Sequence, residues 1–336
     1  MSIEDKAPRV ANIFDVARLA GVSHQTVSRV LNDLPNVRPA TRARVEQAIA
    51  QLKYSPSPAA RALVTRRTRT IGLITPGISD YGPTSIAMHF NVAARAARYS
   101  VDTVTALDAD ATAIRWVIES LLRQRVDALV LIVVDNAVLE FIRSLELTIP
   151  LVAVAATQRR STHIVSIDQY RGARSAVRHL AELGHTRIHH LAGPSTAPDA
   201  IERVRGWRDE LAAQRLEVPE LLQGDWTAAS GYDLGQHLES GTAAFASNDQ
   251  MAIGLLSSLR DRGIRVPEDI SVVGFDDVPE APYMFPPLTT IRQDFAALGA
   301  LMMQKVLVAV EEPESATEDT PLSTKLIVRQ STAAVE

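Results

Sequence analysis

Apolar positions at the start of the chain recur every three or four residues, which predicts short amphipathic helices. In the first of these helices the recurring positions are Ile13, Val16, Ala17 and Ala20. Gly21 supplies a turn position that tolerates positive φ, and Ser23 is a suitable N-cap for a second helix over residues 24–31. Two helices joined by such a tight turn form a helix-turn-helix.

A third helix is predicted from Pro39, because proline suits the first helical position. Its buried stripe consists of Val45, Ala48, Ile49 and Leu52. Arg38 stands where a capping Ser or Asp would be preferred, so this helix begins weakly. In the linker that follows, Ser57 and Pro58 can open a short helix at about residues 57–65. So short a helix is marginal in water, and we expect it to be ordered only when a partner holds it.

From Thr70 onward, apolar runs alternate with amphipathic stretches, which predicts repeated β-strand and α-helix. The pattern restarts at the segment HIVSID, so two doubly wound α/β lobes with parallel sheets are expected. The predicted fold class is therefore α/β, with an N-terminal three-helix helix-turn-helix domain and a hinge in front of the two lobes. The predicted domains are residues 1–70 for the helix-turn-helix and hinge, 71–160 with 292–322 for the first lobe, and 161–291 with 323–336 for the second lobe.

The charge of the chain is divided unevenly. Residues 1–70 hold 12 Lys and Arg against 5 Asp and Glu, a net charge of +7, whereas the remainder carries −11 and the total is −4. A basic module gains affinity for nucleic acid because it releases the counterions of the phosphates, and an acidic body avoids unspecific binding to polyanions. The alternative is a merely solvated basic surface.

Composition and motifs exclude several classes of protein. The chain has no cysteine, and therefore neither disulfides nor a thiol nucleophile. Its start lacks the apolar core of a signal peptide, and no stretch reaches the roughly 18 apolar residues of a membrane span, so a cytoplasmic protein is expected. Neither G-x-S-x-G, nor a glycine-rich phosphate loop, nor H-E-x-x-H is present, so we expect neither an enzyme nor a cofactor. A metal site is not expected at His185, His189 and His190, since successive strand residues face opposite ways.

The second predicted helix has a polar side that suits DNA. Val27, Val30 and Leu31 cluster on one side of it. The other side carries Gln25, Ser28, Arg29 and Asn32. Glutamine can pair with adenine, arginine with guanine, and a serine hydroxyl with base edges or phosphate. The hypothesis is a recognition helix in the major groove, and the alternative is an ordinary solvated helix face.

Seven segments together carry a family likeness: IFDVARLAGVSHQTVSRVLN, PAARAL, RGWRDEL, GDWTAASG, SNDQMAIG, ISVVGFDD and PPLTTIRQDF. Over almost its whole length the chain resembles the lactose-repressor (LacI/GalR) family of bacterial transcription regulators. The resemblance implies lobes of the periplasmic-binding-protein-like type I and a homodimer on a near-palindromic operator of double-stranded DNA. It also implies that His24, Gln25 and Arg29 contact bases.

Leu63 falls on the family's minor-groove wedge, an apolar side chain that kinks DNA by partly unstacking a base step. The alternative for Leu63 is ordinary packing in a linker helix. The full set of predicted DNA-contacting residues is Ser23, His24, Gln25, Thr26, Ser28, Arg29, Asn32, Ser57 and Leu63.

Polar and aromatic residues that follow the strands of the second lobe are expected to converge, because ligands bind outside the carboxyl ends of parallel strands. They are Asp168, Arg203, Trp226, Asn248, Asp276 and Gln293. Their chemistry suits a mono- or disaccharide, since carboxylates, amides and a guanidinium bind hydroxyls and an indole covers C–H groups. The resemblance implies that all but Asp168 line the family's inducer pocket. It adds a first-lobe loop that contains Asp80, Tyr81, Gly82 and Thr84.

Each of these residues has an ordinary alternative: the carboxylates as helix caps, Trp226 as core and Arg203 as a solvated residue. Ala155 departs from the pattern of a lactose-responsive member, which has an acid there, so the effector need not be a lactose analogue. The hypothesis is a repressor of carbohydrate-utilisation genes that a sugar releases from DNA. Alternatives are a corepressor-type regulator that answers to a purine or a phosphorylated protein, a sugar-binding transport protein, and a sugar-processing enzyme.

Overall fold

The computed structural model describes residues 11–31, 35–54, 67–77, 80–106, 111–156, 164–312, 315 and 320–335. The chain divides into two compact units, Met1–Thr68 and Arg69–Glu336. The predicted hinge helix at 57–65 lies outside the described residues, and so do three predicted DNA-contacting residues, Asn32, Ser57 and Leu63.

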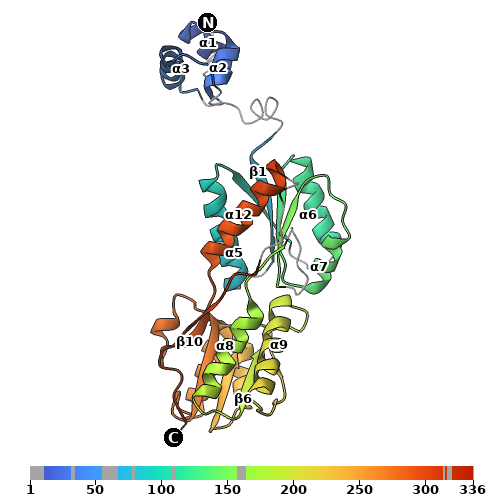
Figure 1. Ribbon diagram of the computed structural model, residues 1–336, viewed down its shortest axis with the longest axis vertical. Coiled ribbons are helices and arrows are strands. Elements are labelled where there is room, and N and C mark those ends of the chain that lie inside the picture. The colour runs from blue at the N-terminus through green and yellow to red at the C-terminus, as the bar shows by residue number, and fades with distance from the viewer. Residues whose placement is uncertain are drawn as a thin grey trace, which may run out of the picture. The chain divides into compact units, whose positions relative to one another are not determined.

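The first unit contains three helices around a small apolar core (Figure 1). They are α1 (Ile13–Ala20), α2 (His24–Leu31) and α3 (Pro39–Leu52). A capping box starts α1, because Asn12 Oδ1 accepts from the backbone of Asp15 while Asp15 Oδ2 accepts from the backbone of Asn12. Gly21 ends α1 in the left-handed region at φ 65°, as the predicted tight turn requires. The helix-turn-helix expected from the sequence is therefore present.

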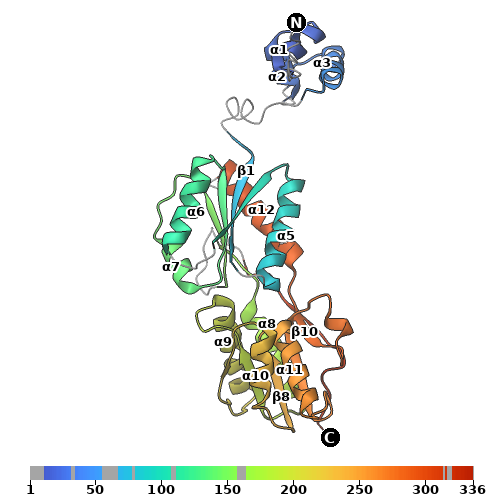
Figure 2. The same cartoon turned by 180° about the vertical axis from the view of Figure 1, so that it is seen from behind.

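The first lobe of the second unit is a five-stranded parallel sheet in the order β2-β1-β3-β4-β5. Its strands are β1 (Thr70–Pro76), β2 (Ser100–Ala106), β3 (Ala128–Ile132), β4 (Leu151–Val154) and β5 (Ile164–Val165). Figures 1 and 2 show one face covered by α5 (Tyr81–Ala96) and α12 (Phe295–Glu311), and the other by α6 (Ala111–Arg123) and α7 (Asn136–Arg143). Because helices cover both faces, the central strand β3 is apolar and buried throughout.

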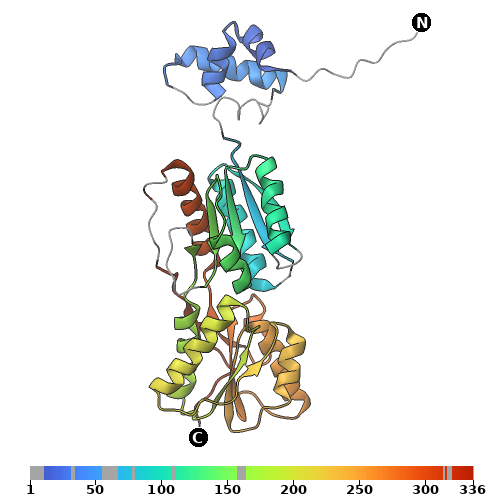
Figure 3. The same ribbon diagram turned by 90° about the vertical axis from the view of Figure 1, so that its right-hand side faces the viewer.

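The second lobe has a six-stranded sheet in the order β11-β10-β9-β8-β6-β7, parallel except for β11. Its strands are β6 (Ile188–Ala192), β7 (Leu222–Gln223), β8 (Thr242–Ala246), β9 (Ile270–Asp276), β10 (Thr289–Arg292) and β11 (Lys325–Ile327). Figure 3 shows the sheet between two pairs of helices, α8 (Gln169–Glu182) with α9 (Pro198–Ala213) and α10 (Ala228–Gly235) with α11 (Asp249–Asp261). A short 3-10 helix, η1 (Ala281–Tyr283), follows β9. The prediction of two doubly wound lobes is confirmed.

The boundary between the lobes differs from the prediction. The sequence places HIVSID at the start of the second lobe, but β5 within this segment pairs with β4 in the first sheet. The reason is burial: Val165 is 1% exposed in the first core, so the chain completes that sheet before it crosses. It crosses between β5 and α8, returns between β10 and α12, and crosses again before β11.

The predicted loop after β1 is also partly wrong, since Tyr81, Gly82 and Thr84 belong to the first turn of α5. Gly82 and Pro83 make this stretch a weak helix signal in the sequence. Proline is nevertheless tolerated in a first turn, where its missing N–H has no partner within the helix.

Candidate DNA-reading helix and effector pocket

Helix α2 separates an apolar side from a polar side, as the spacing predicts. Val27 and Val30 are 0% and 5% exposed and pack in the core of the first unit. His24, Gln25 and Arg29 are exposed. The three predicted base-contacting side chains therefore stand outside the core, where a DNA groove can reach them.

Two hydroxyls at the start of α2 already serve the helix. Ser23 Oγ accepts from the backbone N–H of Thr26 at 3.2 Å, and it lies 3.0 Å from Thr26 Oγ1. Thr26 and Ser28 are half-buried, whereas Ser23 is exposed. Ser23 is thus the predicted N-cap, and contact of these three residues with DNA stays a prediction.

The second unit contains a pocket between its two lobes, lined from both sides. Its polar lining comes from Asp80, Tyr81, Ser166, Gln169, Asp199, Arg203, Trp226, Asn248, Asp276 and Gln293. The first lobe contributes a mostly apolar wall, which includes Ile86, Ile132, Val133, Val154, Ala155, Phe295 and Leu298. The predicted effector residues therefore converge, except for Thr84 and Asp168.

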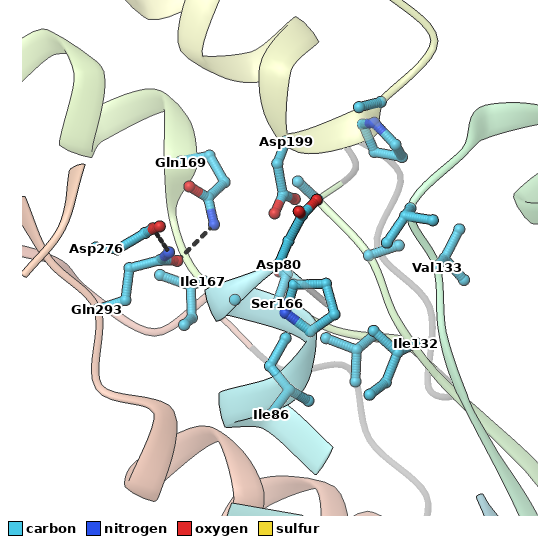
Figure 4. A pocket seen from close by; sticks show the side chains of 18 of the residues that line it. Asp80, Ile86, Ile132, Val133, Ser166, Ile167, Gln169, Asp199, Asp276 and Gln293 are labelled. Carbon is cyan, nitrogen blue, oxygen red and sulfur yellow. Dashed lines mark hydrogen bonds between the residues drawn. The ribbon is translucent and has the colours of Figure 1, made fainter. Parts of the chain in front are cut away.

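A hydrogen-bonded chain of four side chains forms the second-lobe wall of the pocket. Arg203 Nε donates to Gln169 Oε1 at 3.0 Å, and Gln169 Nε2 donates to Gln293 Oε1 at 2.8 Å. Gln293 Nε2 then donates to Asp276 Oδ1 at 2.6 Å (Figure 4). Arg203 Nη2 lies 3.8 Å from the same oxygen of Asp276, so the chain closes on itself. Such a network fixes the orientation of the donors and acceptors that these four side chains present to the cavity.

The guanidinium of Arg203 is held between aromatic rings. Its Cζ lies 3.9 Å from the ring centroid of Phe275 and 5.3 Å from that of Trp226. Nη1 donates to the carbonyl of Ser247. Gly193 allows this packing, since a Cβ there would lie 2.4 Å from the Trp226 ring. The pocket therefore has an indole beside a fixed cation, which suits the C–H face and the hydroxyls of a sugar.

The helix-turn-helix and the lobes both match known families. Residues 12–57 match the family of bacterial regulatory proteins called the lacI family, and residues 177–332 match a periplasmic binding protein-like domain. The chain is 32% identical to the lactose operon repressor of Escherichia coli (strain K12), over 96% of this chain and 91% of that protein. The chain belongs to the LacI family. It is thus a DNA-binding transcription regulator.

This LacI-family regulator is also similar to a further transcription regulator and to a solved repressor structure. It is 36% identical to the HTH-type transcriptional regulator GalS of Salmonella typhimurium, over 88% of each chain. The crystal structure of the lac repressor dimer bound to operator and the anti-inducer ONPF matches it with a TM-score of 0.86 at 31% identity, covering 97% of this chain and 100% of that one. The similarity therefore extends over both units.

Asn248 holds the pocket's indole as well as capping a helix. Its Oδ1 accepts from the backbone of Met251 at 2.9 Å, and its Nδ2 donates to the carbonyl of Trp226 at 3.0 Å. Trp226 has φ 76°, a left-handed conformation that costs energy for a bulky residue. Asn248 thus helps to hold a strained residue that lines the cavity of this LacI-family regulator.

Asp168 does not line the pocket. Its Oδ1 accepts from the backbone of Arg171 at 2.9 Å, and its own N–H donates to the carbonyl of Leu322 at 2.8 Å. It is the N-cap of α8, the ordinary alternative considered for it, because the cap position aims the carboxylate at the helix N–H groups. Thr84, in the first turn of α5, is likewise absent from the lining.

Two polar lining residues escape the strand-end rule. Gln169 is the first residue of α8, one position after the predicted Asp168, and it is 4% exposed. Asp199 lies in the first turn of α9 behind Pro198. The only sequence signal for Asp199 is its place after Pro198, and acids are common in first turns for the helix dipole alone.

Burial alters the acid–base chemistry of the pocket. Burial raises the pKa of Asp276 to about 6, although the charge of Arg203 and the hydrogen bond from Gln293 oppose this. Burial also raises the pKa of Asp199, against the charge of Arg203 and a backbone N–H of Ala156. The pKa of Asp80 is raised by burial and by the charge of Asp225. Near neutral pH the pocket is a site of closely spaced acids around one cation.

The histidines of the second lobe are placed as the strand pattern predicts. His190 is buried, stacks 4.5 Å from the Phe245 ring and has Nδ1 2.9 Å from the Phe245 carbonyl. His189 is only half-buried, and His185 Nε2 lies 3.2 Å from the Ala333 carbonyl. Within the described residues, no group of three potential ligands gathers to hold a metal ion. Nor is any described helix long and apolar enough to span a bilayer.

Proposed function

We propose that this LacI-family regulator represses carbohydrate-utilisation genes and is released from its operator by a sugar bound in the pocket between the lobes. It works as a homodimer in the cytoplasm, on a near-palindromic double-stranded site. One helix such as α2 contacts too few bases to select a site in a genome, so two copies of Gln25 and Arg29 are needed at a fixed spacing.

The observation that carries the sugar proposal is the closed network of Arg203, Gln169, Gln293 and Asp276 beside the Trp226 ring. Its amides and carboxylate offer donors and acceptors in fixed directions, which matches neighbouring hydroxyls of a ring. The indole covers the C–H face of the same ring.

Release of DNA follows from linkage. A sugar that binds one arrangement of the lobes more tightly shifts the dimer towards it, and operator affinity falls by the same factor if that arrangement separates the DNA-binding units. The mechanism is therefore tested by measuring the affinity for DNA with and without effector, and the affinity for effector with and without DNA. The structure of a similar protein, the complex of the transcriptional regulator CelR with cellobiose, supports a sugar as the effector.

The experiment is a mobility-shift titration with full-length protein on a DNA site selected from random sequence, repeated with two variants. Asp276→Ala removes an acceptor from the pocket and is expected to give a protein that binds the site but is not released by sugar. Arg29→Ala removes an exposed residue of α2 and is expected to abolish site selection while calorimetric sugar binding persists.

Three outcomes contradict the proposal. Ligand that strengthens the DNA complex indicates a corepressor-type regulator. Unchanged release of Asp276→Ala by sugar places the effector elsewhere. We also expect no turnover of a bound sugar, so product formation in a long incubation would indicate an enzyme instead.

A further inference from the structure

The charges that line the pocket are unbalanced. Asp80, Asp199 and Asp276 contribute three carboxylates, and among the described lining residues Arg203 is the only Lys, Arg or His. A neutral hexose compensates none of the excess negative charge. Because a buried charge is costly unless it is paired, this imbalance points to the charge of the ligand.

Arg203 cannot neutralise all of these acids. Its Nε and Nη1 already donate to Gln169 and to the Ser247 carbonyl, and Nη2 faces Asp276 at 3.8 Å. The charge of Arg203 also acts on the pKa of Asp199, one turn earlier in α9. One cation is therefore shared among three acids, and a further positive charge on the ligand reduces the excess of negative charge.

The two remaining carboxylates have few partners. Asp80 occupies the N-cap position of α5, yet its side chain makes no capping hydrogen bond. Asp199 accepts from the backbone of Ala156. Figure 4 shows both carboxylates directed into the same pocket, from helices of different lobes. An N-cap aspartate that leaves its own helix unsatisfied keeps its oxygens available for a ligand.

Asp276 gives an independent indication that a ligand belongs here. The side chain is 6% exposed, and its hydrogen bond from Gln293 and its contact with Arg203 both involve Oδ1. Among the described residues no hydrogen bond reaches Oδ2. This oxygen of a pocket-lining carboxylate is therefore left to accept from a ligand, and a ring hydroxyl is a suitable donor.

We propose that the effector is a sugar that carries a protonated amine, with its hydroxyls on the Gln169, Gln293 and Asp276 network and its ammonium group held by Asp199 and Asp80. This inference rests on the proposed sugar site and adds the charge of the ligand. An ammonium offers three donors and one positive charge, which matches two under-partnered carboxylates from opposite lobes. Since the acids come from both lobes, the ammonium also favours one arrangement of the lobes.

The test is calorimetry of the full-length protein near neutral pH with glucosamine, galactosamine and mannosamine. Each is compared with its neutral parent hexose and its N-acetyl derivative. At least one amine is expected to bind roughly tenfold to a hundredfold more tightly than both, the usual range for a charged hydrogen bond. A parent or N-acetyl sugar that binds as tightly as the amine overturns the inference.

Asp199→Asn is expected to remove the preference for the amine over the parent hexose. Asp261→Asn is the matched control, because Asp261 is a partly exposed acid of α11 that pairs with Tyr232 outside the pocket, and its loss should change neither affinity. Asp80→Asn gives a second measurement if Asp199→Asn does not fold. Retention of the preference in both pocket variants overturns the inference.

The two proposals fail in different ways. If only neutral sugars bind and release the operator, the proposed function holds and the charge assignment is wrong. If no sugar of either kind binds or releases the operator, both are wrong.

Discussion

Glu210 joins the two helices that carry much of the effector pocket, and its removal gives a quantitative prediction. Its carboxylate accepts from Arg174 Nε at 2.6 Å, from Arg178 Nε at 2.8 Å and Nη2 at 2.9 Å, and from Gln214 Nε2 at 3.0 Å. The arginines belong to α8 and Glu210 to α9, and the Glu210 side chain is 1% exposed. This clamp therefore holds α8 against the end of α9.

The magnitude follows from the pKa of Glu210. Burial raises this pKa, but the hydrogen bonds from Arg178, Gln214 and Arg174 outweigh burial and lower it from 4.5 to about 2. At about 1.4 kcal/mol per pH unit, the ionised carboxylate contributes up to about 3 kcal/mol to the free energy of unfolding near neutral pH. Because the folded pKa is the lower one, the contribution is present above about pH 4.5 and is lost as the pH falls towards 2.

Glu210→Gln is therefore expected to cost up to about 3 kcal/mol at pH 7 and only about half as much at pH 3. Urea unfolding at both values, followed by the fluorescence of the buried Trp207, measures the difference. Asp209→Asn is the control, since the exposed Asp209 makes one bond to the Tyr170 hydroxyl and should cost less than about 1 kcal/mol at either pH. A penalty for Glu210→Gln that is equal at both pH values would refute the assignment.

Two further predictions concern the second lobe, one on the pH dependence of its stability and one on the packing of its helices. Burial, with the charge of Asp276, raises the pKa of Asp249 to about 8, so the fold keeps a proton that the unfolded chain releases near 3.8. The free energy of unfolding of the wild type should then fall as the pH rises between these two values, whereas that of Asp249→Asn should not show this fall. Urea unfolding at about pH 5 and about pH 8 measures the difference. An equal fall in both proteins would contradict the raised pKa of Asp249. Gly254→Ala places a Cβ 1.8 Å from the Ala228 carbonyl oxygen and is expected to cost about 1–3 kcal/mol by forcing α10 from α11. At Gly82→Ala the new Cβ meets no atom of the described residues within 4 Å, so this variant should be near neutral by thermal unfolding. A similar loss of stability in both glycine variants would count against close packing as the cause.

Most of the fold could be predicted from the sequence because its signals are local. Gly21 at φ 65° and the spacing of apolar residues in α1 and α2 determine the helix-turn-helix within a few residues. The strand β3 is a continuous apolar run, as a strand buried on both faces must be. By contrast, the two-residue strand β5 has no signal of its own, since its place in the first sheet is decided by the neighbour β4.

The sequence predicts where the effector pocket lies better than it predicts which side chains line it. Carboxyl ends of parallel strands meet at one edge, which correctly brings Trp226, Asn248 and Asp276 together. The rule fails one residue further, where Asp168 caps α8 while Gln169 enters the pocket. A step of one residue turns a helical side chain by about 100°, so the choice between neighbours depends on how the helix docks. The strand pattern does not contain that information.

The position of Gln169 and Gln293 also explains how a ligand can act on the lobes. Gln169 opens α8 directly after the first crossing between the lobes, and Gln293 lies within the second, between β10 and α12. Their hydrogen bond of 2.8 Å therefore joins two crossing segments. Any rotation of one lobe against the other must change the backbone at these crossings, since hinge motions are absorbed by a few residues at the ends of elements. A ligand that binds Gln169 and Gln293 consequently contacts the two segments at which the lobes rotate against each other. Such a ligand binds two lobe arrangements with different affinities, and release of DNA requires this difference.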